Sequence, residues 1–230
     1  MADNIKKAGS IKKLLMALLV IGPASILVLI STLKCEHRFK KLDVFGTIPA
    51  YEAVTGENRK INNNTFKNEV VIYTTLQESC PKECGISLWF VDRHLFRHIR
   101  ENRKKLGYVK IVSFVIDKDG NPVDDVSNME QILRDNVIEY DPNIWILAKG
   151  NAQAVFNIEH NGQNLIDANG EEFINGKAYN SLLLLADKKN QLRMVMRGDS
   201  EGTVRTLQQH LFLLLKEYDL EAYKEAHSKK

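Results

Sequence analysis

The sequence has no large excess of charge of one sign, no internal repeat and no low-complexity tract. Its 230 residues carry a formal net charge of +3, without the clustered basic stripe that binds nucleic acids. This excludes the nucleic-acid binders as a class. Hydrophobic residues make up 44% of the chain and charged residues 27%, which are ordinary values for a globular protein. About 190 residues follow the N-terminal region, and these suffice for one well-buried core.

Charged side chains are absent from residues 14–33, LLMALLVIGPASILVLISTL. A helix of this length spans roughly 30 Å, the thickness of the hydrocarbon core of a bilayer. Gly22 and Pro23 would weaken a soluble helix, but membrane helices tolerate both. A cleaved signal peptide is the alternative, but its apolar region is usually about 7–15 residues and ends in a small-residue cleavage site. The segment therefore predicts a retained single-pass anchor.

Lysines and arginines flank this anchor on both sides, so the positive-inside bias almost cancels. A leading span usually sends a long C-terminal domain across, and no Arg/Ser-rich transit segment precedes it. We therefore expect a bacterial inner-membrane protein whose soluble domain faces the periplasm.

Cys35 is interpreted as an incidental thiol, because Lys34 stands where a lipoprotein signal needs a small residue. The expected parts are a cytoplasmic N-terminus (1–13), the anchor (14–33), a tether (34–41), a soluble domain (42–220) and a tail (221–230).

The soluble part alternates strand patterns with helix patterns. Predicted strands are two short ones around a turn at 55–58, then 69–76, 108–117, 143–150, and a hairpin within 180–198. Predicted helices run from Pro81 to about Lys105, near 128–136, over 151–162 and over 202–218. This order implies parallel strand pairs, with the late hairpin as an antiparallel edge. The expected fold is α/β and thioredoxin-like, with a central mixed sheet flanked by helices.

The segment ESCPKECGI places Cys80 and Cys84 at the joint between a strand and a helix. Pro81 suits the first helical position, which would make Cys80 the N-cap or its neighbour. The helix dipole and the unpaired N–H groups there would favour the thiolate. Cys84 would lie one turn later on the same helix face. Such a pair can close a disulfide or hold one soft ion, and Cu(I) prefers sulfur ligands.

Two plainer interpretations of the cysteine pair remain open. One is a static structural disulfide, although a loop this short constrains the unfolded chain only slightly. The other is two unrelated buried cysteines, against which the placement at a strand end and Pro81 both argue.

Three histidines are the candidates for further metal ligands. His94 and His98 share a helix face at a ligand spacing, but on a continuous helix Cys84 would lie about 15 Å away. With the arginines around them, they are predicted to form a solvated basic face. His160 is expected near the end of a helix as a cap or exposed residue, and it stays a candidate metal ligand.

These features resemble the Sco/SenC family, membrane-anchored thioredoxin-like proteins that help deliver copper to cytochrome c oxidase. CPKEC matches the family's C-P-x-x-C in the same setting, and the resemblance covers about residues 42–215. Three later segments resemble the family's in the same order: KIVSFVIDKDGNP with Asp117, DPNIWILAKGNAQAVFNI with Asp141, Pro142, Trp145 and Gly150, and LLLLADKKNQLRMVMRGD with Asp187.

One part of the family's pattern is missing. Thioredoxins carry a cis-proline opposite the cysteine pair, and no proline precedes the strand near residue 181. The resemblance implies a metal-binding histidine in that neighbourhood, but the matching position falls on Tyr179, or on Asn180 if the register slips by one. A phenol with a pKa near 10 is a poor ligand at neutral pH. We therefore expect Cu(I) to bind in a two-coordinate way, while tight Cu(II) binding is not expected.

Three functions follow as hypotheses. The first is a Sco-like metallochaperone that binds copper through Cys80 and Cys84, or reduces the cysteines of a cytochrome c oxidase subunit. The second is a general thiol–disulfide oxidoreductase acting on other periplasmic thiol proteins, in which Cys80 attacks and Cys84 resolves. The third is a non-enzymatic interaction or sensing domain. A metabolic enzyme is not expected.

Overall fold

The computed structural model describes only part of the chain: residues 41–82, 86–160, 163–164 and 182–228, with six isolated helical positions between 16 and 26. The chain divides into two units, Met1–Lys40 and Lys41–Lys230. Among the described residues, no helix has both the length and the apolar character needed to span a membrane. Most of the predicted anchor (14–33) and of the tether (34–41) lies outside the described residues, as does Cys35. Both stay predictions.

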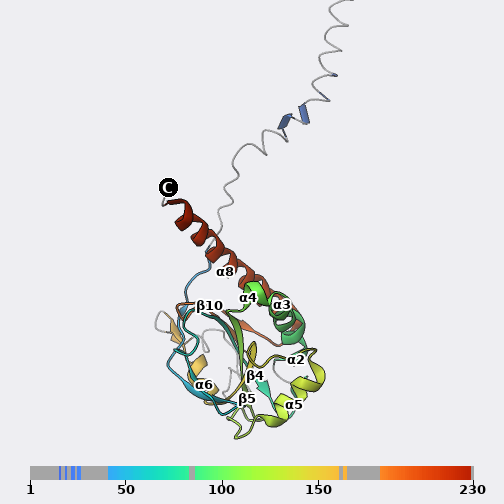
Figure 1. Ribbon diagram of the computed structural model, residues 1–230, viewed down its shortest axis with the longest axis vertical. Helices are drawn as coiled ribbons and strands as arrows, with labels where there is room; N and C mark the ends of the chain where they lie inside the picture. Colours follow the sequence, from blue (N-terminus) through green and yellow to red (C-terminus); the bar gives the residue numbers. More distant parts are fainter. Residues whose placement is uncertain are drawn as a thin grey trace, which may run out of the picture. The chain divides into compact units, whose positions relative to one another are not determined.

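A mixed sheet organises the second unit (Figure 1). The described strands are β1 (Gly46–Thr47), β2 (Glu52–Thr55), β3 (Lys60–Asn62), β4 (Val70–Gln77), β5 (Val109–Ile116), β6 (Trp145–Gly150), β7 (Glu159–His160), β8 (Gln163–Asn164), β9 (Leu182–Ala186) and β10 (Gln191–Arg197). The order in the main sheet is β1-β10-β9-β4-β5-β6-β2-β3, with β7 and β8 as a separate hairpin. Strands β4, β5 and β6 are parallel to one another, and the other pairs are antiparallel. The expected mixed sheet and its late hairpin are confirmed.

Both faces of the sheet are covered, which explains the nearly continuous apolar strands. Successive side chains of β4 alternate between two cores: Ile72 packs with the helices that follow the strand, while Tyr73 packs in a second cluster that includes α6 (Ala152–Phe156). Seven of the eight residues of β4 are buried, so this strand lies in the interior of the fold.

The remaining described helices are α2 (Leu88–Val91), the π-helix η1 (Asp92–Phe96), α3 (Arg97–Glu101), α4 (Arg103–Leu106), α5 (Ser127–Asn136) and α8 (Glu201–Ser228). The predicted helix from Pro81 to about Lys105 is therefore wrong in its start and in its regularity. It begins at Leu88, because the hydroxyl of Ser87 accepts the N–H of Trp89 at 3.3 Å and caps the first turn. It then widens into η1 and is interrupted again at Asn102.

Two other helices differ in length from the prediction. The helix expected over 151–162 is α6, which ends at Phe156, and the chain then turns into the β7–β8 hairpin. The C-terminal helix was expected to end at residue 218, but α8 continues to Ser228 through the predicted tail. Residues 219–228 contain several good helix formers, and Glu221 forms an ion pair with Lys41.

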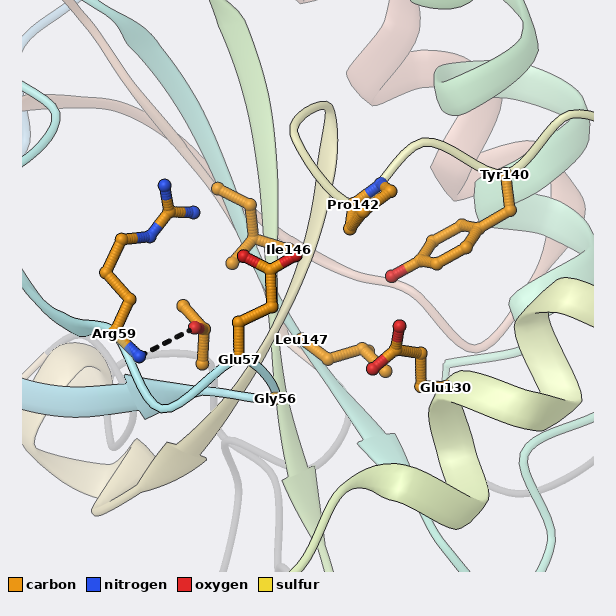
Figure 2. A pocket seen from close by; sticks show the side chains of 9 residues that line it. Gly56, Glu57, Arg59, Glu130, Tyr140, Pro142, Ile146 and Leu147 are labelled. Carbon is orange, nitrogen blue, oxygen red and sulfur yellow. Dashed lines mark hydrogen bonds between the residues drawn. The ribbon is translucent and has the colours of Figure 1, made fainter.

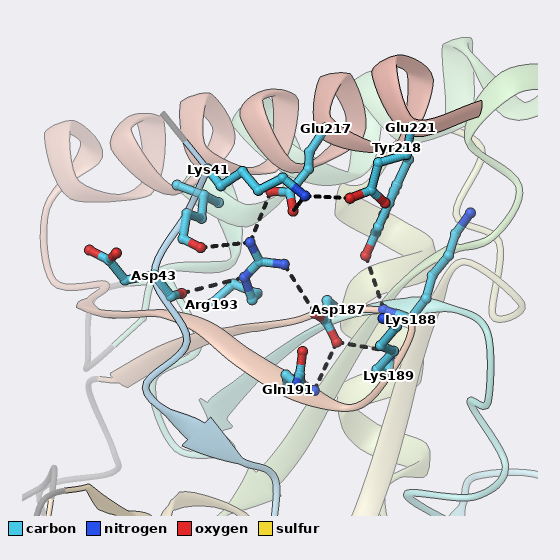
Figure 3. Close-up of polar contacts among 11 residues, drawn as sticks. Lys41, Asp43, Asp187, Lys188, Lys189, Gln191, Arg193, Glu217, Tyr218 and Glu221 are labelled. Atoms are coloured by element: carbon cyan, nitrogen blue, oxygen red, sulfur yellow. Dashed lines mark hydrogen bonds and ion pairs between the residues drawn. The ribbon is translucent and has the colours of Figure 1, made fainter. Parts of the chain in front are cut away.

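A buried cluster of charges joins residues 41–43 to the β9–β10 hairpin and to α8 (Figure 3). Arg193 lies at a bulge in β10, and its guanidinium is 3.1 Å from Asp187 Oδ2 and 2.9 Å from Glu217 Oε2. It also donates to the carbonyl oxygen of Leu42 at 2.7 Å. The side chains of all three charged residues are 4–7% exposed. The cluster therefore fixes the start of this unit against its last helix.

Candidate functional site

The cysteine loop, residues 78–87, follows strand β4 at the carboxyl edge of the parallel strands. Its residues 83–85, and with them Cys84, lie outside the described residues. The N–H of Glu78 donates to the carbonyl of Ile116 at 2.9 Å, which holds the start of the loop beside the end of β5. Ligands of open α/β sheets bind outside this edge. Cys80 is thus placed where such folds commonly carry out their chemistry.

The link between the loop and α2 differs from the prediction. Pro81 is not the first helical residue, since α2 begins at Leu88 and its cap is Ser87. Instead, the carbonyl oxygen of Pro81 accepts the N–H of Leu88 at 3.0 Å. Cys80 therefore does not cap the helix, and a thiolate-favouring effect of a cap position is not part of this site.

Cys80 is disulfide-bonded and half-buried. The other two cysteines of the chain, Cys35 and Cys84, both lie outside the described residues. The described part of the site is consequently an oxidised sulfur at the end of a buried strand, on a segment that reaches the surface at Ser79 and Lys82.

The far end of the loop is anchored in the core. Ile86 is 1% exposed and lies against Gly198, at the end of β10. A Cβ atom at position 198 would come within 2.8 Å of Ile86 and 2.9 Å of Leu183. This close approach needs a glycine, and it fixes where the loop returns to the sheet.

An exposed tryptophan follows the loop. Trp89, in the first turn of α2, is 42% exposed, and the ammonium group of Lys82 lies 5.4 Å from its ring centroid. The sequence had assigned no role to Trp89. Because the helix begins seven residues later than expected, the face that it buries could not be deduced from spacing alone.

Asp117, which the resemblance singled out, stabilises the turn after β5. Its Oδ1 accepts the N–H groups of Asp119 at 2.8 Å and of Asn121 at 2.7 Å. Its Oδ2 accepts from the side-chain amide of Asn121 at 3.0 Å. These bonds account for an aspartate at this position through turn geometry.

The predicted solvated basic face is wrong for His94. This residue of η1 is 9% exposed, and its Nε2 lies 2.9 Å from Oε1 of Glu201, the first residue of α8. The carboxylate can only accept, so Nε2 carries the proton. The ring of His98 meets Phe212 edge-on, with 4.7 Å between centroids. Both histidines therefore contact α8, and the sequence had predicted this for neither of them.

Replacing Glu201 with glutamine tests this contact. The hydrogen bond from His94, followed by the charges of Arg93 and Arg205, lowers the pKa of Glu201 from 4.5. Because the pKa of Glu201 is lowered in the folded state, its ionised form stabilises the fold above pH 4.5. This contribution is lost as the pH falls through the lowered folded-state pKa. We expect the variant to have a lower melting temperature than the parent at pH 7, with the difference shrinking toward pH 3. Glu225→Gln, on the exposed end of α8, is the control and should show no such convergence.

A third metal ligand is not identified by the described residues. His160 lies in β7 rather than at a helix end, with its backbone paired to Gln163. Tyr179 and Asn180 lie outside the described residues. Within the part of the chain that is described, no group of three or more His, Cys, Asp or Glu residues could hold a metal ion. The role of His160 stays a prediction.

A small pocket opens between the β2–β3 turn and α5, and sequence analysis did not point to it (Figure 2). Glu57, Glu130 and Tyr140 line it, and the hydroxyl of Tyr140 donates to the carbonyl of Trp145 at 2.9 Å. A Cβ at Gly56 would lie 2.9 Å from the carboxylate of Glu130. The described contacts are those of a helix docked on a turn.

No protein-family model and no curated protein sequence matches the chain. Solved structures that are similar in fold include a SCO1/SenC family lipoprotein from Bacillus anthracis str. Ames, with 15% identity, a TM-score of 0.49, and coverage of 74% of this chain and 95% of that one. Yeast Sco1 with copper bound has 11% identity, a TM-score of 0.45, and coverage of 72% and 92%. Thiol peroxidase from Chromobacterium violaceum has 14% identity, a TM-score of 0.45, and coverage of 79% and 90%. At such values the chemistry has to be argued from this chain's own residues.

Proposed function

We propose that the protein is a membrane-anchored, Sco-like thiol protein that binds Cu(I) through Cys80 and Cys84, or reduces partner cysteines, during maturation of the copper site of cytochrome c oxidase. The observation that carries this proposal is the disulfide of Cys80 at the carboxyl edge of the sheet. A sulfur that can be oxidised at this position can also be reduced and exchanged with another sulfur.

The proposed partner of Cys80 in the disulfide is Cys84. A disulfide requires Cα atoms about 4.4–6.8 Å apart. Residues 81 and 82 turn directly after Cys80, and Cys84 follows within the same loop, whereas Cys35 lies far earlier in the sequence. In the reduced form two neighbouring thiolates suit Cu(I), which favours soft sulfur ligands and accepts two-coordination.

The setting of the domain belongs to the same proposal. The uncharged run at 14–33 anchors the chain in the bacterial inner membrane, and the domain at 42–220 faces the periplasm. Disulfides form and persist in that compartment, which agrees with the oxidised state of Cys80. Copper is cargo or ligand in this function, and partner proteins supply the cysteines that are reduced.

Titration of the reduced full chain with Cu(I) under anaerobic conditions, against a competing chelator, tests the copper branch. We expect one Cu(I) per chain, with binding lost in Cys80→Ser and in Cys84→Ser. Cys35→Ser is the matched control and should bind like the parent chain. Weak copper binding together with active disulfide exchange would favour the general oxidoreductase instead. The absence of both activities would leave an interaction domain.

A further inference from the structure

Trp89 differs from the other tryptophan of the chain in being exposed. Trp145 is fully buried and donates its indole N–H to Ser113 at 2.8 Å, whereas Trp89 is 42% exposed in the first turn of α2. Its backbone is fixed, because its N–H donates to the Ser87 hydroxyl. A large aromatic surface in a fixed position contributes strongly to binding when a partner covers it.

The position of Trp89 relative to the reactive sulfur follows from two contacts. The carbonyl of Pro81 bonds to the N–H of Leu88, so the segment after Cys80 folds back onto the first turn of α2. The ammonium of Lys82 lies 5.4 Å from the centroid of the indole ring. Because the Cα atoms of Cys80 and Lys82 are at most about 7 Å apart, the exposed ring lies beside the segment that carries the thiol site.

We infer that Trp89 and Lys82 form the surface that recognises the protein partner of Cys80. The partner it fits is a polypeptide segment whose cysteine is followed or preceded by an apolar side chain and a carboxylate. The apolar side chain covers the indole, and the carboxylate pairs with Lys82, whose charge is exposed beside the ring. This inference rests on the proposed thiol chemistry and names the partner that the same site selects.

Two disulfide probes separate recognition from chemistry. The first is the small neutral bis(2-hydroxyethyl) disulfide, which offers nothing for Trp89 or Lys82 to bind. The second is the cyclic peptide Ac-Leu-Cys-Glu-Gly-Gly-Cys-NH2, with a matched peptide in which glycine replaces leucine and glutamine replaces glutamate. Reduction of each probe by the reduced full chain is followed by the release of thiol.

We expect Trp89→Ala to lower the second-order rate constant for reduction of the Leu/Glu peptide roughly tenfold to thirtyfold, a typical result of truncating a central interface aromatic. The rate with the small disulfide should stay unchanged, and Trp89→Phe should restore most of the loss. Lys82→Gln should lower the rate of reduction only for the peptide that carries glutamate. High salt should remove this difference between the variant and the parent chain. The control is Ile138→Ala, because Ile138 is 67% exposed and lies outside the cysteine loop. This variant should reduce both probes at the rates of the parent chain.

Two results would overturn the inference while leaving the proposed function intact. One is an equal loss of rate for both probes in Trp89→Ala, which would indicate a structural role. The other is equal rates for the two peptides in the parent chain. If the parent chain reduces neither the peptides nor the small disulfide, the thiol chemistry itself fails, and the inference fails with it.

Discussion

Replacing Arg193 with leucine is expected to lower the free energy of unfolding by about 3–5 kcal/mol, the usual cost of removing one partner from a buried ion pair. The guanidinium lies between Asp187 and Glu217, and all three side chains are nearly inaccessible to water. Leucine would leave two buried carboxylates without their common cation. It would also leave the carbonyl of Leu42 without the donor that reaches it at 2.7 Å.

Part of the cluster survives the substitution, which bounds the effect. Oδ1 of Asp187 still accepts the N–H groups of Lys189 and Gln191, both at 2.9 Å. Glu217 keeps the ammonium of Lys41 at 3.5 Å, although that lysine is 62% exposed. These contacts stabilise the carboxylates only in part, because the lysine pair is screened by solvent.

Urea unfolding of the full chain in detergent, followed by tryptophan fluorescence, measures the loss. Arg197→Leu is the matched control, since Arg197 lies in the same strand and pairs with Asp199 where both side chains are about 40% exposed. Such an exposed pair is worth at most about 1 kcal/mol. A comparable loss of unfolding free energy in both variants would mean that the buried Arg193 cluster contributes no more stability than an exposed ion pair.

A second readout concerns the segment at 41–43. Arg193 donates to the carbonyls of Leu42 and Asp43, and these bonds hold the segment against β10 (Figure 3). In Arg193→Leu we expect trypsin to cleave after Lys41 faster than in the Arg197 control, under conditions where the rest of the fold is intact. Unchanged cleavage would show that other contacts fix the segment.

The strands of this fold could be predicted because the local composition of a buried strand indicates its burial. VVIYTTLQ and VKIVSFVI are rich in β-branched and aromatic residues and occupy the centre of the sheet. The helix after the cysteine loop could not be placed in the same way. The helix begins after Ser87, whose hydroxyl caps its first turn. Pro81 is also typical of a helix start, but in the structure its carbonyl oxygen accepts the N–H of Leu88 instead.

The candidate site shows the same division. The spacing of cysteines and the preceding strand singled out Cys80, which is disulfide-bonded, and its redox role stays a prediction. His94 is buried within the π-helix and bonded to Glu201, 107 positions later. No local pattern contains that information. The exposure of Trp89 was missed for a related reason, since it depends on which residue begins α2.

Substituting the two cysteines of the loop one at a time should give opposite results in disulfide exchange. In the proposed reaction the Cys80 thiolate attacks one sulfur of a partner disulfide, forming a mixed disulfide and releasing the other partner sulfur as a thiolate. Cys84 then attacks Cys80, forms the intramolecular disulfide and releases the second thiolate, so that two electrons pass to the partner. Cys80→Ser should therefore abolish exchange and trap nothing.

Cys84→Ser should instead accumulate the mixed disulfide, because the attacking thiol remains while the resolving thiol is missing. Intact mass spectrometry of the full chain, mixed with bis(2-hydroxyethyl) disulfide, detects this adduct as a fixed mass increase that reductant removes, because the leaving thiol of this probe diffuses away. Cys35→Ser is the control and should neither trap the adduct nor slow exchange. If Cys35→Ser traps the adduct and Cys84→Ser does not, the partner of Cys80 is Cys35, and the proposed disulfide within the loop is wrong. If neither variant traps it, the sulfur of Cys80 does not act as a nucleophile, and its disulfide is a static crosslink.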